Sequence, residues 1–334
     1  MTTDKTEVSE ETKDSKKPRA TTDLGKIAAY GLTLAGLVIL AATSLRLFAT
    51  QWWVADLFCQ FAVQYVLLLI PIVLGLFFIG RRKSAALFLI VWLVNVIVIS
   101  PDIPIAADRP VLDDTLRLLT QNVLTSNRDY QSVIDLIDNE QPDFVVLIEI
   151  DRGWINGMSE LHFVYPFRKT VTHSGNFGIG IYSKIPWTDC QARDTGPDRL
   201  PTIYAEFTVN DKPFQIVGTH PFPPVGGGPA NSRNQQLIEV AESMNLSMPR
   251  ILTGDFNLTP WSPWFSRVLE IAQLQDPATI FDITPTWYLF PTILGGVKID
   301  HALVADLKVT DHRIGPDVNS DHRAVILDFS VSND

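Results

Sequence analysis

Hydrophobic residues gather into three long runs near the N-terminus of this 334-residue chain. The first run, 27–47, carries no charge before Arg46, a second covers 57–80, and a shorter third covers 84–100. A helix rises about 1.5 Å per residue, so roughly 20 apolar residues cross the hydrocarbon core of a bilayer. The pattern predicts a three-span transmembrane anchor over residues 25–101. A cleaved signal peptide would have a shorter apolar region and would not be followed by two more runs.

The residues that flank the runs predict an orientation. Residues 1–24 are almost wholly polar and cannot bury enough apolar surface to offset chain entropy, so a disordered tail is expected there. Basic residues precede the first run and separate the second from the third: Lys16, Lys17, Arg19, Lys26, Arg81, Arg82 and Lys83. Basic loops stay in the cytoplasm. The tail is therefore expected inside the cell and everything after Ser100 outside it, with the anchor in the cell membrane.

Beyond the third run, short strand-like segments outnumber helical ones, and residues 102–334 are predicted to form one catalytic domain. The expected strands are 115–123, 144–148, 178–183, 202–209, 214–219, 250–253, 302–309 and 324–329. Helical spacing recurs at 130–137 and 231–244. About 230 residues suffice for a single large core.

The charge of this outer region narrows the choice of substrates. Residues 102–334 contain 30 Asp and Glu against 17 Lys and Arg. The negative electrostatic field of this excess repels long polyanions. Cys190 is the only cysteine in this region, so no disulfide can form within it. Binding of long nucleic acid would require a local basic patch.

Acid, amide and imidazole side chains recur at the ends of the expected strands, where loops meet a rigid sheet. The residues are Asn122, Glu149, His220, Asp255, Asn257, Asp300, Asp321 and His322. Oxygen ligands with few thiols or imidazoles suit Mg²⁺, Mn²⁺ or Ca²⁺ rather than zinc. A phosphate ester is the natural substrate of such a site, because the ion neutralises developing charge while a histidine activates water.

In their order along the chain, these segments resemble the endonuclease/exonuclease/phosphatase superfamily, which includes deoxyribonuclease I, exonuclease III, neutral sphingomyelinases and inositol polyphosphate 5-phosphatases. The matching segments are Gln121-Asn122-Val123, Pro142-Asp143-Phe144, Leu147-Ile148-Glu149, Gly178 to Ser183, Gly218-Thr219-His220, Arg233 with Gln236, Gly254-Asp255-Phe256-Asn257, Ile299-Asp300-His301 and Ser320-Asp321-His322. The resemblance covers roughly 115–329. It implies the α+β class and a four-layer α/β/β/α sandwich like that of deoxyribonuclease I, here behind three transmembrane helices, as in membrane-anchored bacterial members.

The resemblance also implies a metal site. Glu149 would hold one Mg²⁺ or Mn²⁺ ion, with Asn122 beside it and Asp321 completing the site. Nucleases of the family often place a further acidic residue where this chain has Leu124. A single ion is therefore expected.

Catalytic roles follow from the same resemblance. His322 would be the general base, oriented through Asp300, because a fixed tautomer needs a carboxylate on the other ring nitrogen. Asp255 and Asn257 would contact the nucleophile and a phosphate oxygen. His220 would bind the phosphate or protonate the leaving group.

For two further groups of residues the sequence leaves the role open between two alternatives. Arg233 and Gln236 share a helical face and would brace the site or bind the phosphate. Aromatic residues flank the motifs and either rim a cleft or pack in the core: Trp261, Trp264, Phe265, Trp287, Tyr288 and Phe290.

The substrate stays open between nucleic acid and a phospholipid head group. The anchor favours a lipid phosphodiester, whereas nuclease activity is the one most often attached to such sequences. The alternative to an enzyme is a catalytically silent, membrane-tethered module that binds a phosphorylated ligand. Against this alternative, every principal acid, amide and imidazole position is filled.

Overall fold

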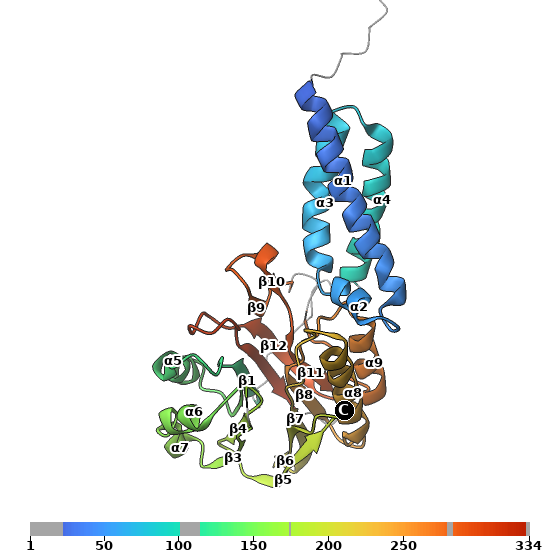
Figure 1. Cartoon of the computed structure of the whole chain (residues 1–334). Helices are drawn as coiled ribbons and strands as arrows, with labels where there is room; N and C mark the ends of the chain where they lie inside the picture. Colours follow the sequence, from blue (N-terminus) through green and yellow to red (C-terminus); the bar gives the residue numbers. More distant parts are fainter. Residues whose placement is uncertain (1–22, 101–113, 174, 279–282, 332–334) are drawn as a thin grey trace, which may run out of the picture.

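The computed structural model describes residues 23–100, 114–173, 175–278 and 283–331. Most of the polar tail expected at 1–24 lies outside these residues, and the first helix begins at Asp23. An N-terminal helical bundle stands on a larger domain of strands and helices (Figure 1).

The N-terminal region contains four α-helices. They are α1 (Asp23–Leu45), α2 (Trp53–Cys59), α3 (Ala62–Phe78) and α4 (Arg82–Ile99), with a short turn η1 (Arg46–Phe48) after α1. By length and composition α1 and α4 can each cross a membrane, whereas α2 and α3 meet the same criterion only as a pair bent by 62°. The apolar run 57–80 is therefore not one helix, and the described residues contain two or three candidate spans rather than a definite three.

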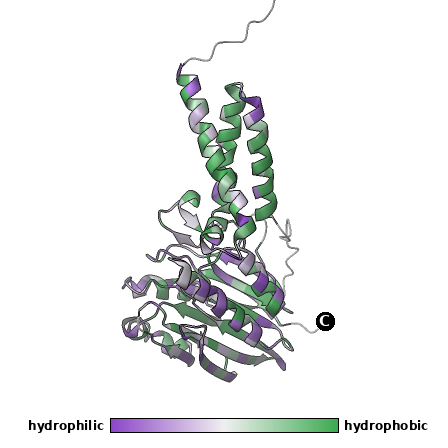
Figure 2. Ribbon diagram, turned by 45° about the vertical axis from the view of Figure 1, so that its right-hand side comes forward, coloured by the Kyte–Doolittle hydropathy of each residue, from purple (hydrophilic) through white to green (hydrophobic). Residues whose placement is uncertain are grey.

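Apolar side chains fill the bundle and also cover its outside. Leu69, Leu76 and Phe88 are fully buried between the helices, while Phe78 and Ile97 are among the large apolar side chains that point outward. Figure 2 shows that hydrophobic residues predominate along the length of the helices. A helix that is hydrophobic all round belongs in a large core or in a membrane. The start of α1 and the connection between α3 and α4 lie at the end of the bundle away from the larger domain (Figure 1).

Two mixed sheets, each with one parallel strand pair, form the centre of the larger domain. One has six strands in the order β12-β13-β1-β2-β4-β3, and the other has five in the order β11-β8-β7-β6-β5. The bounds in the six-stranded sheet are β1 (Leu116–Asn122), β2 (Phe144–Ile148), β3 (Phe167–Val171), β4 (Ile179–Ser183), β12 (Lys308–Ile314) and β13 (Val325–Ser330). Those in the five-stranded sheet are β5 (Trp187–Thr195), β6 (Leu200–Val209), β7 (Lys212–Gly218), β8 (Arg250–Asp255) and β11 (Asp300–Ala305).

Alternation along the strands builds three apolar layers. On β1, Leu118 packs between the sheets with Phe144 and Phe207, whereas the next residue, Leu119, packs on the outer face against Val133. The helices of that outer face are α5 (Tyr130–Glu140), α6 (Arg152–Gly157) and α7 (Leu161–Val164). The outer face of the five-stranded sheet is covered by α8 (Gly227–Ser243) and α9 (Pro263–Ala272). The four-layer α/β/β/α sandwich is thus confirmed.

Strand register brings the polar residues to one edge of the sandwich. β1 and β2 are parallel with Asn122 opposite Ile148, so Glu149 follows directly beside Asn122. In the other sheet, β8 and β11 pair Asp255 with Asp300. A small two-stranded sheet, β9 (Trp287–Tyr288) and β10 (Gly296–Val297) with the turn η2 (Ile293–Gly295), lies at the same edge, between the sandwich and the bundle (Figure 1).

Candidate active site

Glu149 and Asn122 form one side of the site. The Asn122 side chain is fully buried, and its Nδ2 donates to Oε1 of Glu149 at 3.1 Å and to Oδ2 of Asp255 at 3.0 Å. The other Glu149 oxygen accepts from the Thr125 backbone N–H at 3.1 Å. Oδ1 of Asn122 accepts from the Leu124 backbone N–H at 3.0 Å, so the amide holds the two carboxylates in place and presents its nitrogen to them.

The backbone at two of these positions lies in the left-handed region. The φ angles of Glu149 and Asn257 are 65° and 50°. Asparagine adopts this conformation more readily than most residues, whereas glutamate adopts it rarely. Such strain is typical of functional sites, where the surrounding structure holds an unfavoured backbone.

Asp255 lies at the centre of the group. Its Oδ1 accepts from the Asn257 backbone N–H at 2.8 Å, and its Oδ2 lies 3.6 Å from Nε2 of His220 and 3.7 Å from Nε2 of His322. Burial, together with the negative charge of Asp300, raises the pKa of Asp255 to about 8. The carboxylate therefore lies where additional positive charge would stabilise it.

His322 and Asp300 form a buried pair. Nδ1 of His322 lies 2.8 Å from Oδ2 of Asp300, which leaves Nε2 directed at the carboxylates of the cavity. Burial opposes the charged imidazolium, but the carboxylates of Asp300 and Asp255 outweigh it and raise the pKa of His322 to about 10. Ser320 fixes the loop, because its Oγ donates to the Asn122 carbonyl at 2.8 Å and accepts from the His322 N–H at 3.1 Å.

His220 has the opposite electrostatic character. Burial, with a smaller effect of the charge on His322, lowers the pKa of His220 to about 3. The imidazole is therefore neutral at physiological pH. Its ring centroid lies 5.3 Å from that of Phe177, which covers this side of the cavity.

Asp321 completes the acidic cluster. Its Oδ2 accepts from the Trp287 indole N–H at 2.9 Å, while its Oδ1 is buried and has no hydrogen-bond partner among the described residues. Oδ1 of Asp300 is also buried and has no hydrogen-bond partner among the residues that the structure describes. Buried carboxylate oxygens without donors are costly, and a cation would satisfy them.

A metal ion has a possible place here. One atom each of Asp255, Asp300 and His322 lies within 4.8 Å of the others, a buried group that could hold an ion. Glu149 and Asp321 face the same cavity. Carboxylate donors match the preference of Mg²⁺ and Mn²⁺.

Arg233 lies behind the site rather than in the lining of the cavity. Its guanidinium is fully buried, donates through Nη1 to the Asn257 carbonyl at 2.9 Å, and pairs through Nη2 with Asp56 of α2. Its neighbour Gln236 donates to the Thr219 hydroxyl at 3.2 Å. Through these contacts Arg233 and Gln236 support the residues around the cavity. Neither side chain is directed at a phosphate.

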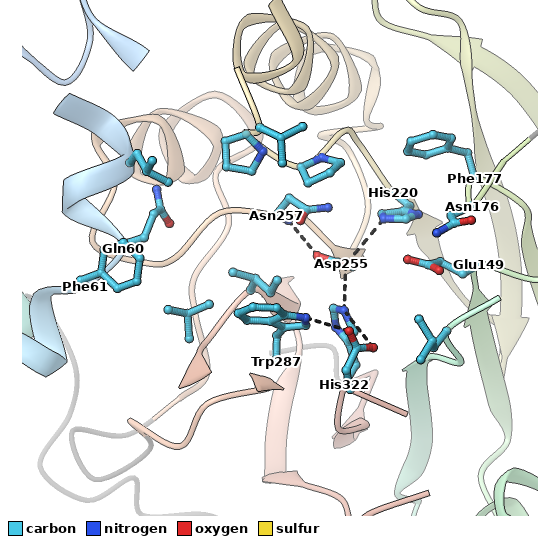
Figure 3. Close-up of a pocket in the computed structure, with 18 of the residues that line it drawn as sticks. Gln60, Phe61, Glu149, Asn176, Phe177, His220, Asp255, Asn257, Trp287 and His322 are labelled. Atoms are coloured by element: carbon cyan, nitrogen blue, oxygen red, sulfur yellow. Dashed lines mark hydrogen bonds and ion pairs between the residues drawn. The ribbon is translucent and has the colours of Figure 1, made fainter. Parts of the chain in front are cut away.

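The cavity itself has a volume of about 790 Å³. Figure 3 shows Asp255 near its centre, Glu149 on one side and Phe61 on the other. No pattern in the sequence predicted that α2 and Phe61, from the N-terminal helical region, would line it. One signal was present, because Asp56 is the only acidic residue between Asp23 and Asp102.

The flanking aromatic residues divide between the two expected roles. Trp287 lines the cavity, and Phe290 is half exposed in the turn beyond it. Trp261 is buried against the start of α3, and Phe265, a residue of α9, lies in the core. Only part of the set therefore rims the cleft.

Comparison with known proteins places the larger domain in a family. The model of the endonuclease/exonuclease/phosphatase family matches residues 119–322. Among solved structures, an endonuclease/exonuclease/phosphatase from Beutenbergia cavernae is 20% identical with a TM-score of 0.54, over 65% of this chain and 71% of that one. D. rerio TDP2 complexed with single strand DNA product is 15% identical with a TM-score of 0.55, over 65% and 100% of the two chains.

A third structure and one negative result complete the comparison. The human Nocturnin catalytic domain with bound sulfate anion is 16% identical with a TM-score of 0.55, over 67% of this chain and 97% of that one. At these identities the structures are similar in fold alone, and the search of curated proteins finds no significant match. The family model covers more than half of the chain, and its matched residues run from β1 to His322. The chain belongs to the endonuclease/exonuclease/phosphatase family.

Proposed function

We propose that this protein is a membrane-anchored phosphoesterase that depends on one Mg²⁺ or Mn²⁺ ion and hydrolyses phosphodiester or phosphomonoester bonds. The observation that carries the proposal is the His322–Asp300 pair, whose Nε2 faces an acidic cavity and lies 3.4 Å from Nδ2 of Asn122. A histidine held by a carboxylate on one nitrogen can accept a proton from water through its other nitrogen when the ring is neutral. The charge of a bound cation would offset the carboxylates that raise the pKa of His322 and would favour this neutral form. Membership of a family of phosphoester hydrolases supports the same conclusion.

The carboxylate oxygens around the cavity support the proposed Mg²⁺ or Mn²⁺ ion. Glu149 and Asp321 would hold the ion, because a metal at Asp255, Asp300 and His322 would compete with the His322–Asp300 hydrogen bond. Oδ1 of Asp321 has no hydrogen-bond partner among the described residues, and the pKa of Asp255 is raised. Both observations are consistent with a bound cation near these carboxylates. When bound, the ion supplies positive charge that neutralises the phosphate and the charge developing on it.

The side chains divide the remaining work. His322 takes the proton of the attacking water, while Asp300 holds the imidazole in the required tautomer. Asp255 orients the water, and Asn257 donates to a phosphate oxygen. His220 is neutral and binds the phosphate or protonates the leaving oxygen. Arg233 acts through the Asn257 carbonyl and is a positioning residue in this proposal.

Metal removal tests the proposal. The full chain in detergent micelles should hydrolyse bis(p-nitrophenyl) phosphate, lose activity in EDTA and regain it with Mg²⁺ or Mn²⁺. In Asp321→Asn the metal concentration for half-maximal activity should rise by roughly 10- to 100-fold or more, as for the loss of a residue that supports a metal.

Asp317→Asn is the matched control for this measurement. Asp317 lies in the same loop, and its carboxylate is 62% exposed and paired with Arg323. The Asp317→Asn variant should have the same metal dependence as the wild type. Turnover that survives EDTA, or an unchanged metal dependence in Asp321→Asn, would contradict the proposal. A folded chain that binds phosphate esters without turnover in any metal would support the silent binding module instead.

The proposed location is the cell membrane, with the N-terminus in the cytoplasm and the catalytic domain outside. Lys26 and the basic residues Arg81 to Lys83 lie toward the end of the bundle away from the catalytic domain, which supports this orientation. A green fluorescent protein fused after Asp334 should be dark when exported through the general secretory pathway. A fusion truncated after Lys83 should fluoresce. Fluorescence of the full-length fusion would reverse the proposed orientation.

A further inference from the structure

One wall of the catalytic cavity is built by the membrane region. Trp53 and Leu57 of α2 line it, together with Gln60 and Phe61 at the bend before α3. Figure 3 shows Gln60 and Phe61 across the cavity from Glu149. The anchor is therefore part of the binding site as well as a tether.

Buried hydrogen bonds fix this wall to the catalytic domain. Asp56 of α2 accepts from the Arg233 guanidinium and from the Ser262 hydroxyl. Four residues further along, Gln60 accepts from the Thr259 backbone N–H at 2.7 Å, and four residues beyond that Gln64 donates to the Gly296 carbonyl at 2.5 Å. Charged hydrogen bonds in a buried setting are strong and directional. The cavity therefore has a defined position at the junction of the bundle and the sandwich.

Away from the acidic cluster, the lining is apolar. Pro223, Pro224 and Val225 form part of it, and Val225 is 80% exposed at the rim. Among the described residues that line the cavity there is no Lys or Arg. A polyanion such as a nucleic acid needs several basic contacts for its phosphates. The cavity offers instead one acidic centre for a single phosphate and an apolar surface beside it.

The turn between β9 and β10 extends this apolar surface toward the bundle. Leu289 and Phe290 are 73% and 51% exposed, and Leu294 is 46% exposed. The turn lies beside α3, because Gln64 of α3 donates to the carbonyl of Gly296, the first residue of β10 (Figure 1). Exposed apolar side chains next to a helix with an apolar exterior are suited to the membrane interface.

We propose that the substrate is a phospholipid-type molecule from the same membrane, an amphiphile with one phosphodiester and long apolar chains. This inference rests on the proposed phosphoesterase activity. The phosphate would lie at Asp255 and His322, and the first part of the apolar chain would lie against Phe61 and Val225. Water adds to phosphorus and loses a proton to His322, one ester P–O bond breaks, and the leaving oxygen is protonated. The products are an alcohol and a phosphomonoester.

A homologous series of substrates tests the apolar wall. The full chain in detergent micelles is assayed with p-nitrophenyl alkyl phosphodiesters whose alkyl arm is methyl, butyl, octyl or dodecyl, and p-nitrophenolate release gives kcat/KM. Each methylene buried by the protein can raise kcat/KM up to roughly fourfold. Partitioning into micelles is the same for all variants, so the comparison of variants isolates the contribution of the protein.

Two variants remove apolar surface from the wall. In Phe61→Ala the ratio of kcat/KM between the dodecyl and methyl esters should fall roughly fivefold or more below the wild-type ratio, and in Val225→Ser roughly threefold. Phe163→Ala is the matched control, because Phe163 is 92% exposed on α7, outside the cavity. Its ratio should equal that of the wild type. Val225 lies on a surface loop, so its substitution keeps the test valid if Phe61→Ala fails to fold.

The outcomes separate this inference from the proposed function. Equal ratios in the wild type and in both wall variants, with the methyl ester hydrolysed, would overturn the lipid substrate and leave the phosphoesterase intact. Faster hydrolysis of a twelve-residue oligothymidylate than of any alkyl ester would do the same and assign a nucleic acid instead. No hydrolysis of any of these compounds with Mg²⁺ or Mn²⁺ would overturn the proposed function itself.

Discussion

Replacing His322 with glutamine should lower kcat for bis(p-nitrophenyl) phosphate by roughly 10²- to 10⁴-fold, the usual contribution of a general base. Glutamine keeps a polar group near Asp300 but cannot accept the proton of water. KM should change little, because the acid and amide groups that would bind the phosphate remain. Steady-state kinetics of the full chain at saturating Mg²⁺ give both constants.

A second substitution separates a base from a merely structural histidine. Asp300→Asn leaves the His322 ring in place but removes the carboxylate 2.8 Å from its Nδ1, so kcat should fall by at least roughly 10². His162→Gln is the control, since His162 lies on α7, outside the lining of the cavity, and its loss should not change kcat. If His322→Gln retained more than about a tenth of the wild-type kcat, the role of general base would have to pass to another group.

Replacing Asp56 with alanine should destabilise the larger domain although Asp56 belongs to α2 of the N-terminal helical bundle. Arg233 is fully buried, and burial already lowers the pKa of its guanidinium, against the effect of Asp56. Removing one partner of a buried pair leaves an uncompensated charge and costs about 3–5 kcal/mol. Arg233 also donates to the Asn257 carbonyl, so activity should fall together with stability. Thermal unfolding in detergent, followed by near-ultraviolet circular dichroism, and kcat measure the two effects.

A double variant shows whether the unpaired charge is the cause. Adding Arg233→Met to Asp56→Ala removes the buried charge and should recover part of the lost stability. Asp194→Ala is the control, because Asp194 and Arg199 form an ion pair on the surface with side chains 53% and 79% exposed. Surface pairs contribute only about 0–1 kcal/mol. An equal effect of Asp56→Ala and Asp194→Ala would remove the proposed structural link between anchor and active site.

This link affects how the protein should be studied. A catalytic domain separated from its anchor would keep Arg233 but lose Asp56, and it would also lose the wall formed by α2 and Phe61. We expect such a fragment to be less stable and to bind amphiphilic substrates poorly. Assays of the full chain avoid both effects.

Much of this protein follows from local pattern in the chain. Uncharged runs identify the apolar helices, because a span requires about 20 consecutive residues that avoid charge. Buried strands such as 144–148 carry continuous apolar runs, and polar residues placed directly after them mark the edge of the sheet where the site forms. The candidate residues are recognisable for this reason. By contrast, β5 is mostly exposed along its length, so its sequence carries no apolar alternation that would predict a strand.

Contacts between distant segments required the folded structure. The bend near Phe61, the pairing of Asp56 with Arg233 across 177 residues, and the bond from Trp287 to Asp321 depend on how whole elements pack. A residue's own neighbours in the sequence do not specify such partners, because packing and strand register decide which side chains meet. The sequence therefore determined the family, the fold and the candidate catalytic groups, and three-dimensional packing decided that the N-terminal helical bundle forms one wall of the cavity.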